Sequence, residues 1–276
     1  MMLDNQDKIL LTNHVKNALK EDAIDKDVTT KSLSLNKIVT AQIISKQTGV
    51  LCGTYWVNEV FRQIDKRVKI KWNKKDSSLI QNNQTIASIT GNSSSILTGE
   101  RVALNFLQTL SGISNKILKY KKKLNTRKVK ILHTRKTLPG WRYATIYAAK
   151  IMGCNPHRTD LSESILIKEN HLCLNNNLSA IVRNAKKMKK SIIVEIKNIG
   201  ELKKINGLDI DRILLDNFKP SDIKKIVKRI NNIPIEVSGN INIKNIYKYN
   251  IPGVSFISIG DLTKNITAHD FSLLML

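Results

Sequence analysis

The fold is decided by residues 191–239, which read SIIVEIKNIGELKKINGLDIDRILLDNFKPSDIKKIVKRINNIPIEVSG. Three short apolar runs within it, at 191–196, 212–215 and 235–237, predict β-strands. The stretch 221–230, between the last two runs, predicts a helix. Because a parallel strand can return only through a crossover connection, strands that alternate with helices form parallel sheets. This stretch therefore predicts an α/β fold.

The same alternation extends on both sides of this stretch. Further strands are predicted at 129–133, 164–167 and 254–259, and further helices at 141–152, 178–190 and 243–249. Six such strands suit a (β/α) barrel, complete or incomplete. A doubly wound open sheet is the alternative, but no G-x-G-x-x-G fingerprint follows a predicted strand.

The first hundred residues predict a different arrangement. Helical spacing covers 7–22, and strands are predicted at 37–44 and 68–72. A longer helix is expected to begin at Thr98, with Thr98 as its N-cap and Arg101 in its first turn. We place the domain boundary near this helix. The sequence thus predicts an N-terminal mixed α/β domain over residues 1–108 and a C-terminal, barrel-like domain over residues 109–276.

The charge of the chain is high, but its pattern does not point to one partner. Lys and Arg number 46 against 22 Asp and Glu, which gives a formal net charge of +24. The lysines are spread along the whole chain, so we interpret most of this charge as surface composition. No run of about 18 apolar residues predicts a membrane span, and no signal peptide is apparent. Cys52, Cys154 and Cys173 lie far apart without a C-x-x-C, which is typical of a reduced, cytoplasmic protein.

The polar residues at the ends of the predicted strands form one candidate site. In (β/α) barrels the active groups lie at the carboxyl ends of the strands, so we expect these residues to meet on one face. Many are cations that suit phosphates or carboxylates, and the acids suit Mg²⁺ or ribose hydroxyls. In chain order they are Thr134, Arg135, Lys136, His157, Arg158, Lys168, Glu195, Asp216, Ser238, Gly239, Asn240, Ile259, Gly260 and Asp261.

This set indicates the binding of anions. Cations at such density are costly unless anions neutralise them. The turn Ser238-Gly239-Asn240 and Gly260 can present backbone N–H groups to a phosphate. No nucleophile paired with a base is apparent, which disfavours hydrolysis through a covalent intermediate. The residues therefore predict a site for a sugar phosphate with several negative charges and a partner that carries carboxylates.

Seven stretches resemble motifs of the quinolinate phosphoribosyltransferase family, also called nicotinate-nucleotide pyrophosphorylases, in the family's order. They are TGERVALNFLQTLSGIS, TRKTLPGWR, HR followed by LSESILIKENH, VEIKN, LLDNF, EVSGNI and GVSFISIGDLTK, and the similarity runs from about residue 28 to the C-terminus. The resemblance implies a pentosyl-transferring glycosyltransferase that is a homodimer. Its reaction joins quinolinate to phosphoribosyl pyrophosphate, with Mg²⁺, and gives nicotinate mononucleotide, pyrophosphate and CO₂ in de novo NAD biosynthesis.

The resemblance also implies roles for single residues. Arg101 of the TGER motif is expected to reach quinolinate across the dimer interface. The implied catalytic residues are Lys136, Lys168, Glu195 and Asp216, of which Glu195 and Asp216 also face Mg²⁺, directly or through water or substrate. The implied substrate pocket comprises Arg101, Thr134, Arg135, Lys136, His157, Arg158, Lys168, Glu195 and Asp216. The implied phosphate site comprises Ser238, Gly239, Asn240, Ile259, Gly260 and Asp261.

Five features depart from the family pattern: the stretch 152–156 before the HR pair has one glycine where several are usual, the turn after this pair is Thr159-Asp160 without the usual glycine, and three single positions differ. His133 stands where an Asp is usual, Lys197 where an acid is usual, and Asp261 where a small residue is usual. Lys197 shares a strand face with Glu195, where it weakens metal binding or adds an anion contact. Asp261 would repel phosphate if its side chain pointed into the site. Because the core binding residues all persist, we still expect activity.

Three other functions stay open. A barrel aldolase or decarboxylase would use Lys136 or Lys168 to form a Schiff base. A nucleic-acid binder would use the +24 charge, and its binding would depend strongly on salt. A phosphoribosyltransferase could also act on nicotinate itself, although a pocket with several cations favours a diacid. The remaining histidines, His14, His133, His171 and His269, lack metal-ligand spacing and are predicted to be structural.

Overall fold

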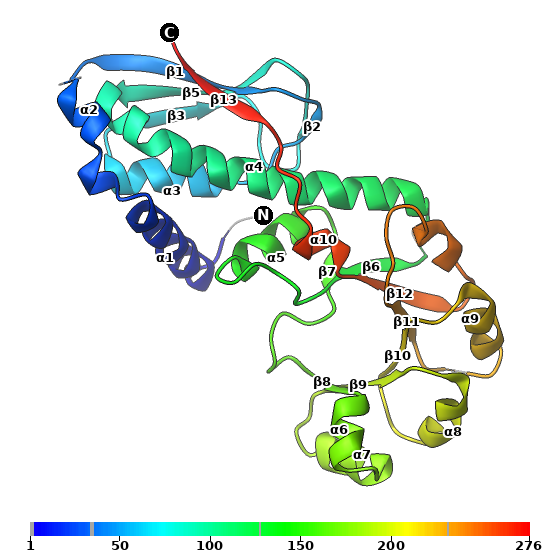
Figure 1. Cartoon of the computed structure of the whole chain (residues 1–276). Helices are drawn as coiled ribbons and strands as arrows, with labels where there is room; N and C mark the ends of the chain where they lie inside the picture. Colours follow the sequence, from blue (N-terminus) through cyan, green and yellow to red (C-terminus); the bar gives the residue numbers. More distant parts are fainter. Residues whose placement is uncertain (1–2, 34–35, 127, 231) are drawn as a thin grey trace. The chain divides into compact units, whose positions relative to one another are not determined.

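A computed structural model describes residues 3–33, 36–126, 128–230 and 232–276 of the chain (Figure 1). The chain forms two compact units, and each unit consists of more than one segment of the sequence. The first unit comprises Met1–Leu118, Thr137–Gly153 and Asn265–Leu276, and the second comprises Lys119–Lys136 and Cys154–Lys264. Segment 137–153 and the last twelve residues thus pack with the N-terminal part, although a division at residues 108 and 109 assigns them to the second domain.

The first unit contains a four-stranded antiparallel sheet with the strand order β13-β1-β5-β3 (Figure 1). Its edge strand β13 comes from the C-terminus, so the end of the chain completes the N-terminal sheet. A separate two-stranded ladder pairs β2 with β4. The strands of this unit are β1 (Ile38–Ser45), β2 (Gly49–Val50), β3 (Lys69–Trp72), β4 (Leu79–Ile80), β5 (Gln84–Asn92) and β13 (Phe271–Met275).

Helices pack with this sheet and bury an aromatic core that includes Trp56, Phe61 and Phe106. Helix α1 buries Leu11, Val15 and Leu19, a spacing of four residues that places all three on one face. The helix predicted at 7–22 is therefore confirmed. The helical elements are α1 (Asn5–Glu21), η1 (Ile24–Lys26), α2 (Val28–Ser32), α3 (Thr54–Ile64), α4 (Ser93–Leu124), which continues into the second unit, and α5 (Arg142–Ile151).

The predicted start of the long helix was wrong. Helix α4 begins at Ser93, where the Asn92 side chain accepts a hydrogen bond from the Ser94 backbone N–H at 2.9 Å. Thr98 lies inside the helix and donates its hydroxyl to Asp27 at 2.9 Å instead of capping the helix. Arg101 consequently lies in the third turn. The helix follows directly from β5, which ends at Asn92.

The second unit contains a parallel sheet of seven strands in the order β7-β6-β12-β11-β10-β9-β8. Strands β7 and β8 form the two edges, which confirms an incomplete (β/α) barrel. Six strands were predicted, and the seventh is the two-residue β7. The strands are β6 (Lys130–His133), β7 (Asn155–Pro156), β8 (Ser164–Ile167), β9 (Ser191–Ile196), β10 (Arg212–Asp216), β11 (Ile235–Ser238) and β12 (Val254–Ile259).

Within the second unit the helices of the described residues are short, at most nine residues long apart from the end of α4, whereas the ten-residue α5 between β6 and β7 belongs to the first unit. The helix expected at 243–249 is only a 3₁₀ turn, η3. The connecting elements are α6 (Glu169–Leu174), α7 (Leu178–Lys186), η2 (Ile199–Glu201), α8 (Leu202–Ile205), α9 (Pro220–Val227), η3 (Ile246–Tyr249) and α10 (Asp261–Lys264). None of the helices in the described part of the chain combines the length and apolarity that crossing a membrane requires.

The strand register determines which side chains share a face of this sheet. Leu214 lies opposite Glu195 on one side and opposite Glu236 on the other. Asp216 lies opposite Ser238. Because paired residues of neighbouring strands point to the same face, and residues two apart on a strand do so as well, these acids and Ser238 share one face. All seven strands are parallel, so their carboxyl ends lie along one edge of the sheet.

Candidate active site

The carboxyl ends of β6 and β7 bring three basic side chains together, those of Arg135, His157 and Arg158. The His157 backbone N–H donates to the His133 carbonyl at 2.8 Å, which extends the pairing of these strands beyond β7. Arg135 and Arg158 each lie two residues after a strand end. Burial lowers the pKa of Arg158, and the nearby charge of Arg135 lowers it further. The two guanidinium groups are therefore close enough to repel each other.

Two nitrogen atoms of this cluster are buried without a hydrogen-bond partner among the described residues. They are Nε of Arg135, which is a donor, and Nε2 of His157, which is a donor only when it is protonated. Arg158 is better satisfied, since its guanidinium donates to the Ser164 carbonyl at 3.2 Å. A buried donor without a partner costs about 1–3 kcal/mol. An anion that contacts both atoms would remove this cost and the repulsion between the arginines, so the cluster is a candidate anion site.

Lys136 is held in place by its backbone while its side chain stays exposed. Its carbonyl accepts a hydrogen bond from the Thr263 hydroxyl at 2.8 Å, and its N–H donates to the Thr134 hydroxyl at 3.3 Å. A Cβ atom at Gly260 would lie 3.1 Å from Cδ of Lys136. The glycine therefore leaves room for the lysine stem, and this brings Lys136 to the turn after β12.

Three carboxylates gather at the ends of β8, β9 and β10. Burial, together with Asp216 and Glu169, raises the pKa of Glu195 to about 7, and Lys168 opposes this rise. The Glu195 and Glu169 carboxyls are close enough that each affects the pKa of the other. Lys197 lies 3.1 Å from Glu169, so its ammonium forms an ion pair with Glu169. The acid cluster is thus partly neutralised by this lysine.

The turn after β11 has positive φ angles at Gly239 and Asn240 and packs against Asn217. Gly239 has φ +93°, and a Cβ atom there would lie 2.4 Å from the Asn217 side-chain oxygen. The Asn240 amide donates to this same oxygen at 3.0 Å, and the Asn217 amide donates to Asp216 at 2.8 Å. Hydrogen bonds therefore link the Ser238-Gly239-Asn240 turn to the neighbouring strand end, and Ser238 itself is half-buried at the end of β11.

At the end of β12 the Asp261 carboxylate is engaged by another residue. The buried Tyr120 donates its hydroxyl to Asp261 at 2.5 Å. Burial and this carboxylate raise the pKa of the Tyr120 phenol. Ile259 is buried, so it can offer only its backbone to a ligand.

The comparisons with known proteins agree along the whole chain. Residues 27–111 match the model of the N-terminal domain of quinolinate phosphoribosyl transferase, and residues 113–274 match that of its C-terminal domain. This chain belongs to the quinolinate phosphoribosyl transferase family. The earlier resemblance is confirmed, and the change of domain model between residues 111 and 113 falls within α4.

Relatives of this family are similar over nearly their full length. A probable nicotinate-nucleotide pyrophosphorylase (carboxylating) of Bacillus subtilis is 31% identical, covering 92% of this chain and 89% of that protein. A probable nicotinate-nucleotide pyrophosphorylase of Methanocaldococcus jannaschii is 33% identical, and the similarity covers 94% of this chain and 95% of that protein. The solved nicotinate-nucleotide pyrophosphorylase of Francisella tularensis has a TM-score of 0.92 at 38% identity, covering 97% and 96%. That of Ehrlichia chaffeensis has a TM-score of 0.91 at 34% identity, covering all of both chains.

Arg101 was predicted to be a site residue, and His133 was predicted to be a structural histidine at a position that departs from the family pattern. Arg101 belongs to the first compact unit and is exposed on α4, whereas the other predicted site residues belong to the second. His133 pairs with Ile259, one residue beyond Ser258, so it lies on the face of the sheet opposite to Glu236. Burial lowers the pKa of His133, and neither ring nitrogen has a partner among the described residues.

Several histidines have structural contacts. His171 accepts the Lys168 backbone N–H at 3.2 Å, and His14 accepts the Trp56 indole N–H at 3.1 Å. His269 is buried and hydrogen-bonded to Ser45 and to Asn115, at 2.8 Å each. In the described part of the chain, no three or more His, Cys, Asp or Glu residues are placed to hold a metal ion.

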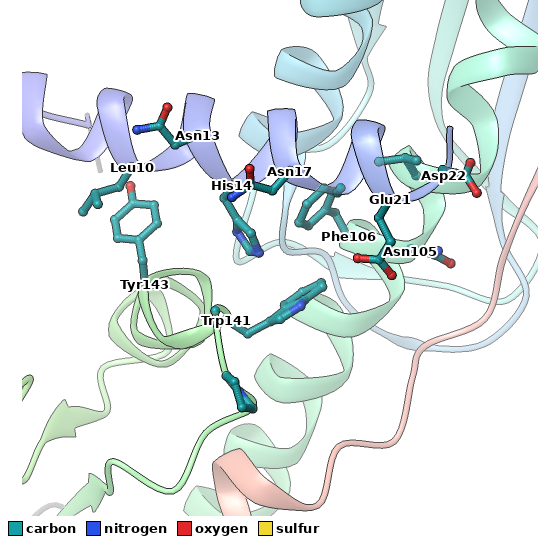
Figure 2. A pocket seen from close by; sticks show the side chains of 14 residues that line it. Leu10, Asn13, His14, Asn17, Glu21, Asp22, Asn105, Phe106, Trp141 and Tyr143 are labelled. Carbon is teal, nitrogen blue, oxygen red and sulfur yellow. The ribbon is translucent and has the colours of Figure 1, made fainter. Parts of the chain in front are cut away.

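The first unit also has a cavity of about 430 Å³ (Figure 2). His14, Phe106 and Trp141 pack there, with ring centroids 4.9 Å apart from His14 to each of the others and 5.2 Å apart between Phe106 and Trp141. None of the predicted site residues lines it. The lining residues are Leu10, Asn13, His14, Asn17, Ala18, Glu21, Asp22, Val102, Asn105, Phe106, Pro139, Gly140, Trp141 and Tyr143.

One residue close to the site was missed by the sequence analysis. Glu236 is fully buried on β11 and contacts His157 at 2.7 Å. Its signal was present, because a charged residue in the apolar strand IEVS is rarely buried unless it is paired.

Proposed function

We propose that this chain transfers the phosphoribosyl group of phosphoribosyl pyrophosphate to quinolinate and releases pyrophosphate and CO₂. The product is nicotinate mononucleotide, a precursor of NAD. One observation carries the proposal: the buried nitrogen atoms Arg135 Nε and His157 Nε2 have no partner among the described residues, and they lie in a cluster whose arginines repel each other. A pyridine dicarboxylate supplies the negative charge and the acceptors that this cluster lacks. Family membership supplies the reaction.

The basic residues divide between the two substrates. Arg135, His157 and Arg158 bind the carboxylates of quinolinate, and Arg101 of a second subunit in a homodimer adds a further cation. Lys136 and Lys168 face the pyrophosphate of the other substrate, where each lysine acts as a compact charge. Thr134 supports this group because its hydroxyl accepts the Lys136 N–H.

The opposite side of the site binds the ribose phosphate. The backbone of Ser238, Gly239 and Asn240 and that of Ile259, Gly260 and Asp261 donate to the 5-phosphate. The positive φ of Gly239 and Asn240 favours such a turn. The Asp261 side chain is held by Tyr120, so at this position the phosphate meets the backbone.

Glu195 and Asp216 accept hydrogen bonds from the ribose hydroxyls and fit Mg²⁺ as ligands, because their donor set is carboxylate oxygen. Two carboxylates suffice when substrate phosphates and waters complete the coordination. When bound, Mg²⁺ would neutralise charge on the pyrophosphate leaving group. The pair between Lys197 and Glu169 keeps one of the three local carboxylates neutralised, which limits repulsion towards the phosphates.

Orientation and charge supply the catalysis. The pyridine nitrogen of quinolinate attacks C1 of the ribose as the bond from C1 to pyrophosphate breaks, and the lysines stabilise the charge that develops on pyrophosphate. The nitrogen carries no proton, so the chain needs no general base for this step. The ring becomes a pyridinium, and its bond to the 2-carboxylate breaks with the electron pair left on C2. CO₂ departs and C2 takes a proton.

An assay of nicotinate mononucleotide and CO₂ tests the proposal. The chain is incubated with quinolinate, phosphoribosyl pyrophosphate and Mg²⁺, and a parallel reaction contains nicotinate instead of quinolinate. We expect product only from quinolinate, loss of most activity in Arg135→Ala and in Glu195→Ala, and little change in Arg183→Ala, an exposed arginine on α7. Full activity in both site variants would overturn the role assignments, and a sucrose-gradient or light-scattering mass tests the homodimer. A cytoplasmic location is part of the proposal and is tested by cell fractionation.

A further inference from the structure

Glu236 forms a buried polar network that includes His157 of the basic cluster. It has no exposed surface, and both neighbours on β11, Ile235 and Val237, are buried apolar residues. One carboxylate oxygen accepts from Nδ1 of His157 at 2.7 Å and from the Ser258 hydroxyl. The other accepts from the Arg212 guanidinium at 2.9 Å. All three partners come from other strand ends or strands, so the carboxylate joins β7, β10 and β12.

The network holds Glu236 as a carboxylate. Burial alone would raise its pKa, but hydrogen bonds from His157, Ser258 and Arg212 lower the pKa below its ordinary value. An ionised carboxylate only accepts hydrogen bonds. Nδ1 of His157 must therefore carry a proton. Arg212 is fixed in turn, because its guanidinium lies 4.1 Å from the Phe256 ring centroid.

The other ring nitrogen of His157 is left for a ligand. Nε2 is buried and has no partner among the described residues, and it belongs to the cluster that contains Arg135. We propose that Glu236 is a positioning residue, which occupies Nδ1–H of His157 and so presents Nε2–H of the charged ring to a carboxylate of the pyridine substrate. This inference rests on the proposed function. It assigns to Glu236 a specific effect on binding of the pyridine substrate, exerted through His157.

Glu236→Gln gives a sharp test because Arg212 can only donate. The single oxygen of glutamine must then face Arg212, and its NH₂ group must face His157 and Ser258. The Ser258 hydroxyl can rotate and accept, and Nδ1 of His157 must become an acceptor. The proton of the ring moves to Nε2 and the ring stays neutral. The variant keeps the shape of the network and removes the charged form of the histidine.

The direct readout is ¹⁵N NMR of histidine-labelled protein, with the His157 signals assigned from His157→Asn. Wild type should show Nδ1 protonated, with both nitrogens protonated when quinolinate is bound. Glu236→Gln should show the neutral ring with its proton on Nε2. A wild-type spectrum in which Nδ1 carries no proton would overturn the inference, and this result does not depend on how well the variant folds. A variant spectrum in which the His157 ring keeps the wild-type protonation would also overturn it.

Kinetics separate this role from a purely structural one. In Glu236→Gln we expect KM for quinolinate to rise about tenfold, the scale of one charge-assisted hydrogen bond, and KM for phosphoribosyl pyrophosphate to change less than about twofold. Ser258→Ala removes a bond to the same oxygen but keeps the charge, so it should leave both constants near wild type. Equal rises in both KM values would contradict the inference.

A double-mutant cycle closes the test. If Glu236 acts through His157, the change Glu236→Gln should add little to the KM for quinolinate in a His157→Asn background. Additive effects would show that Glu236 acts by another route. Wild-type turnover of quinolinate is measured first, so absence of that turnover counts against the proposed function, whereas normal turnover with additive effects counts against Glu236 alone.

Discussion

At the scale of single residues, Gly239 is the position where the site tolerates least change. Its φ of +93° strains any other residue, and a Cβ atom would lie 2.6 Å from the Asn217 backbone nitrogen as well as close to its side chain. We expect Gly239→Ala to displace the turn, raise KM for phosphoribosyl pyrophosphate at least about tenfold and cost about 1–3 kcal/mol of stability. Steady-state kinetics and urea unfolding measure the two effects.

Gly207 provides the matched control. Its φ is +74°, and a Cβ atom there meets nothing within 4 Å. Gly207→Ala therefore imposes the backbone strain without the collision and without touching a predicted site residue. It should lower stability by a similar or smaller amount and leave both KM values unchanged. If Gly207→Ala raised KM for phosphoribosyl pyrophosphate as much as Gly239→Ala does, the turn after β11 would have no specific role.

At the scale of elements, α4 and the C-terminal segment meet at Gly112. A Cβ atom at Gly112 would lie 2.2 Å from the Thr267 carbonyl oxygen, and backbone cannot move aside as a flexible side chain can. Alanine is favoured over glycine in a helix by about 1 kcal/mol, but overpacking of this kind costs about 1–3 kcal/mol or more. We expect Gly112→Ala to destabilise the chain, as measured by urea unfolding at pH 7.

Asn105→Ala on the same helix isolates the propensity effect. Asn105 is exposed, and its side chain accepts only a 3.2 Å bond from Gln108. This change should leave stability within about 0.5 kcal/mol of wild type, since exposed substitutions usually do. A Gly112→Ala variant as stable as Asn105→Ala would mean that the C-terminal segment does not pack closely on α4 as described.

Some of the secondary-structure elements could be predicted from the sequence, and others could not. Strands at 164–167, 191–196 and 254–259 were predicted with their observed bounds, because buried parallel strands are short apolar runs between polar turns. The two-residue β7 and the 3₁₀ turn η3 leave too short a pattern to recognise. The start of α4 was missed because tertiary packing of Ile96 and Val102 outweighs the loop-like serines before them.

The site was predictable to the extent that topology sets it. Parallel strands place their carboxyl ends at one edge, so the residues after β6 to β12 could be grouped before any contact was known. The hydrogen-bond partners of the side chains could not be predicted, because they depend on packing between segments that are far apart in the sequence. The Tyr120 bond to Asp261 and the burial of Glu236 are contacts of this kind, and each changes what the residue contributes.

At the scale of the whole molecule, two histidines make stability depend on pH. Burial lowers the pKa of His14 to about 4 and that of His269 to about 4, although Asp270 opposes the shift of His269. In the unfolded chain each titrates near 6.5, so as pH falls from 6.5 to 4 the unfolded state takes up protons that the folded state refuses. The free energy of unfolding should therefore decrease between pH 6.5 and pH 4. Below pH 4 these two histidines should cause no further decrease.

Urea unfolding at pH 7 and pH 5, at constant ionic strength, measures this slope. Constant salt matters because the net charge of +24 grows as histidines protonate, and its self-repulsion also destabilises the fold. His269→Gln keeps hydrogen-bonding groups near Ser45 and Asn115 but cannot titrate. Whatever its stability at pH 7, the variant should lose less on going to pH 5 than wild type does. Equal decreases in the free energy of unfolding in the two proteins would show that His269 takes up a proton in the folded state as readily as in the unfolded chain. The burial of His269 would then not keep its ring neutral.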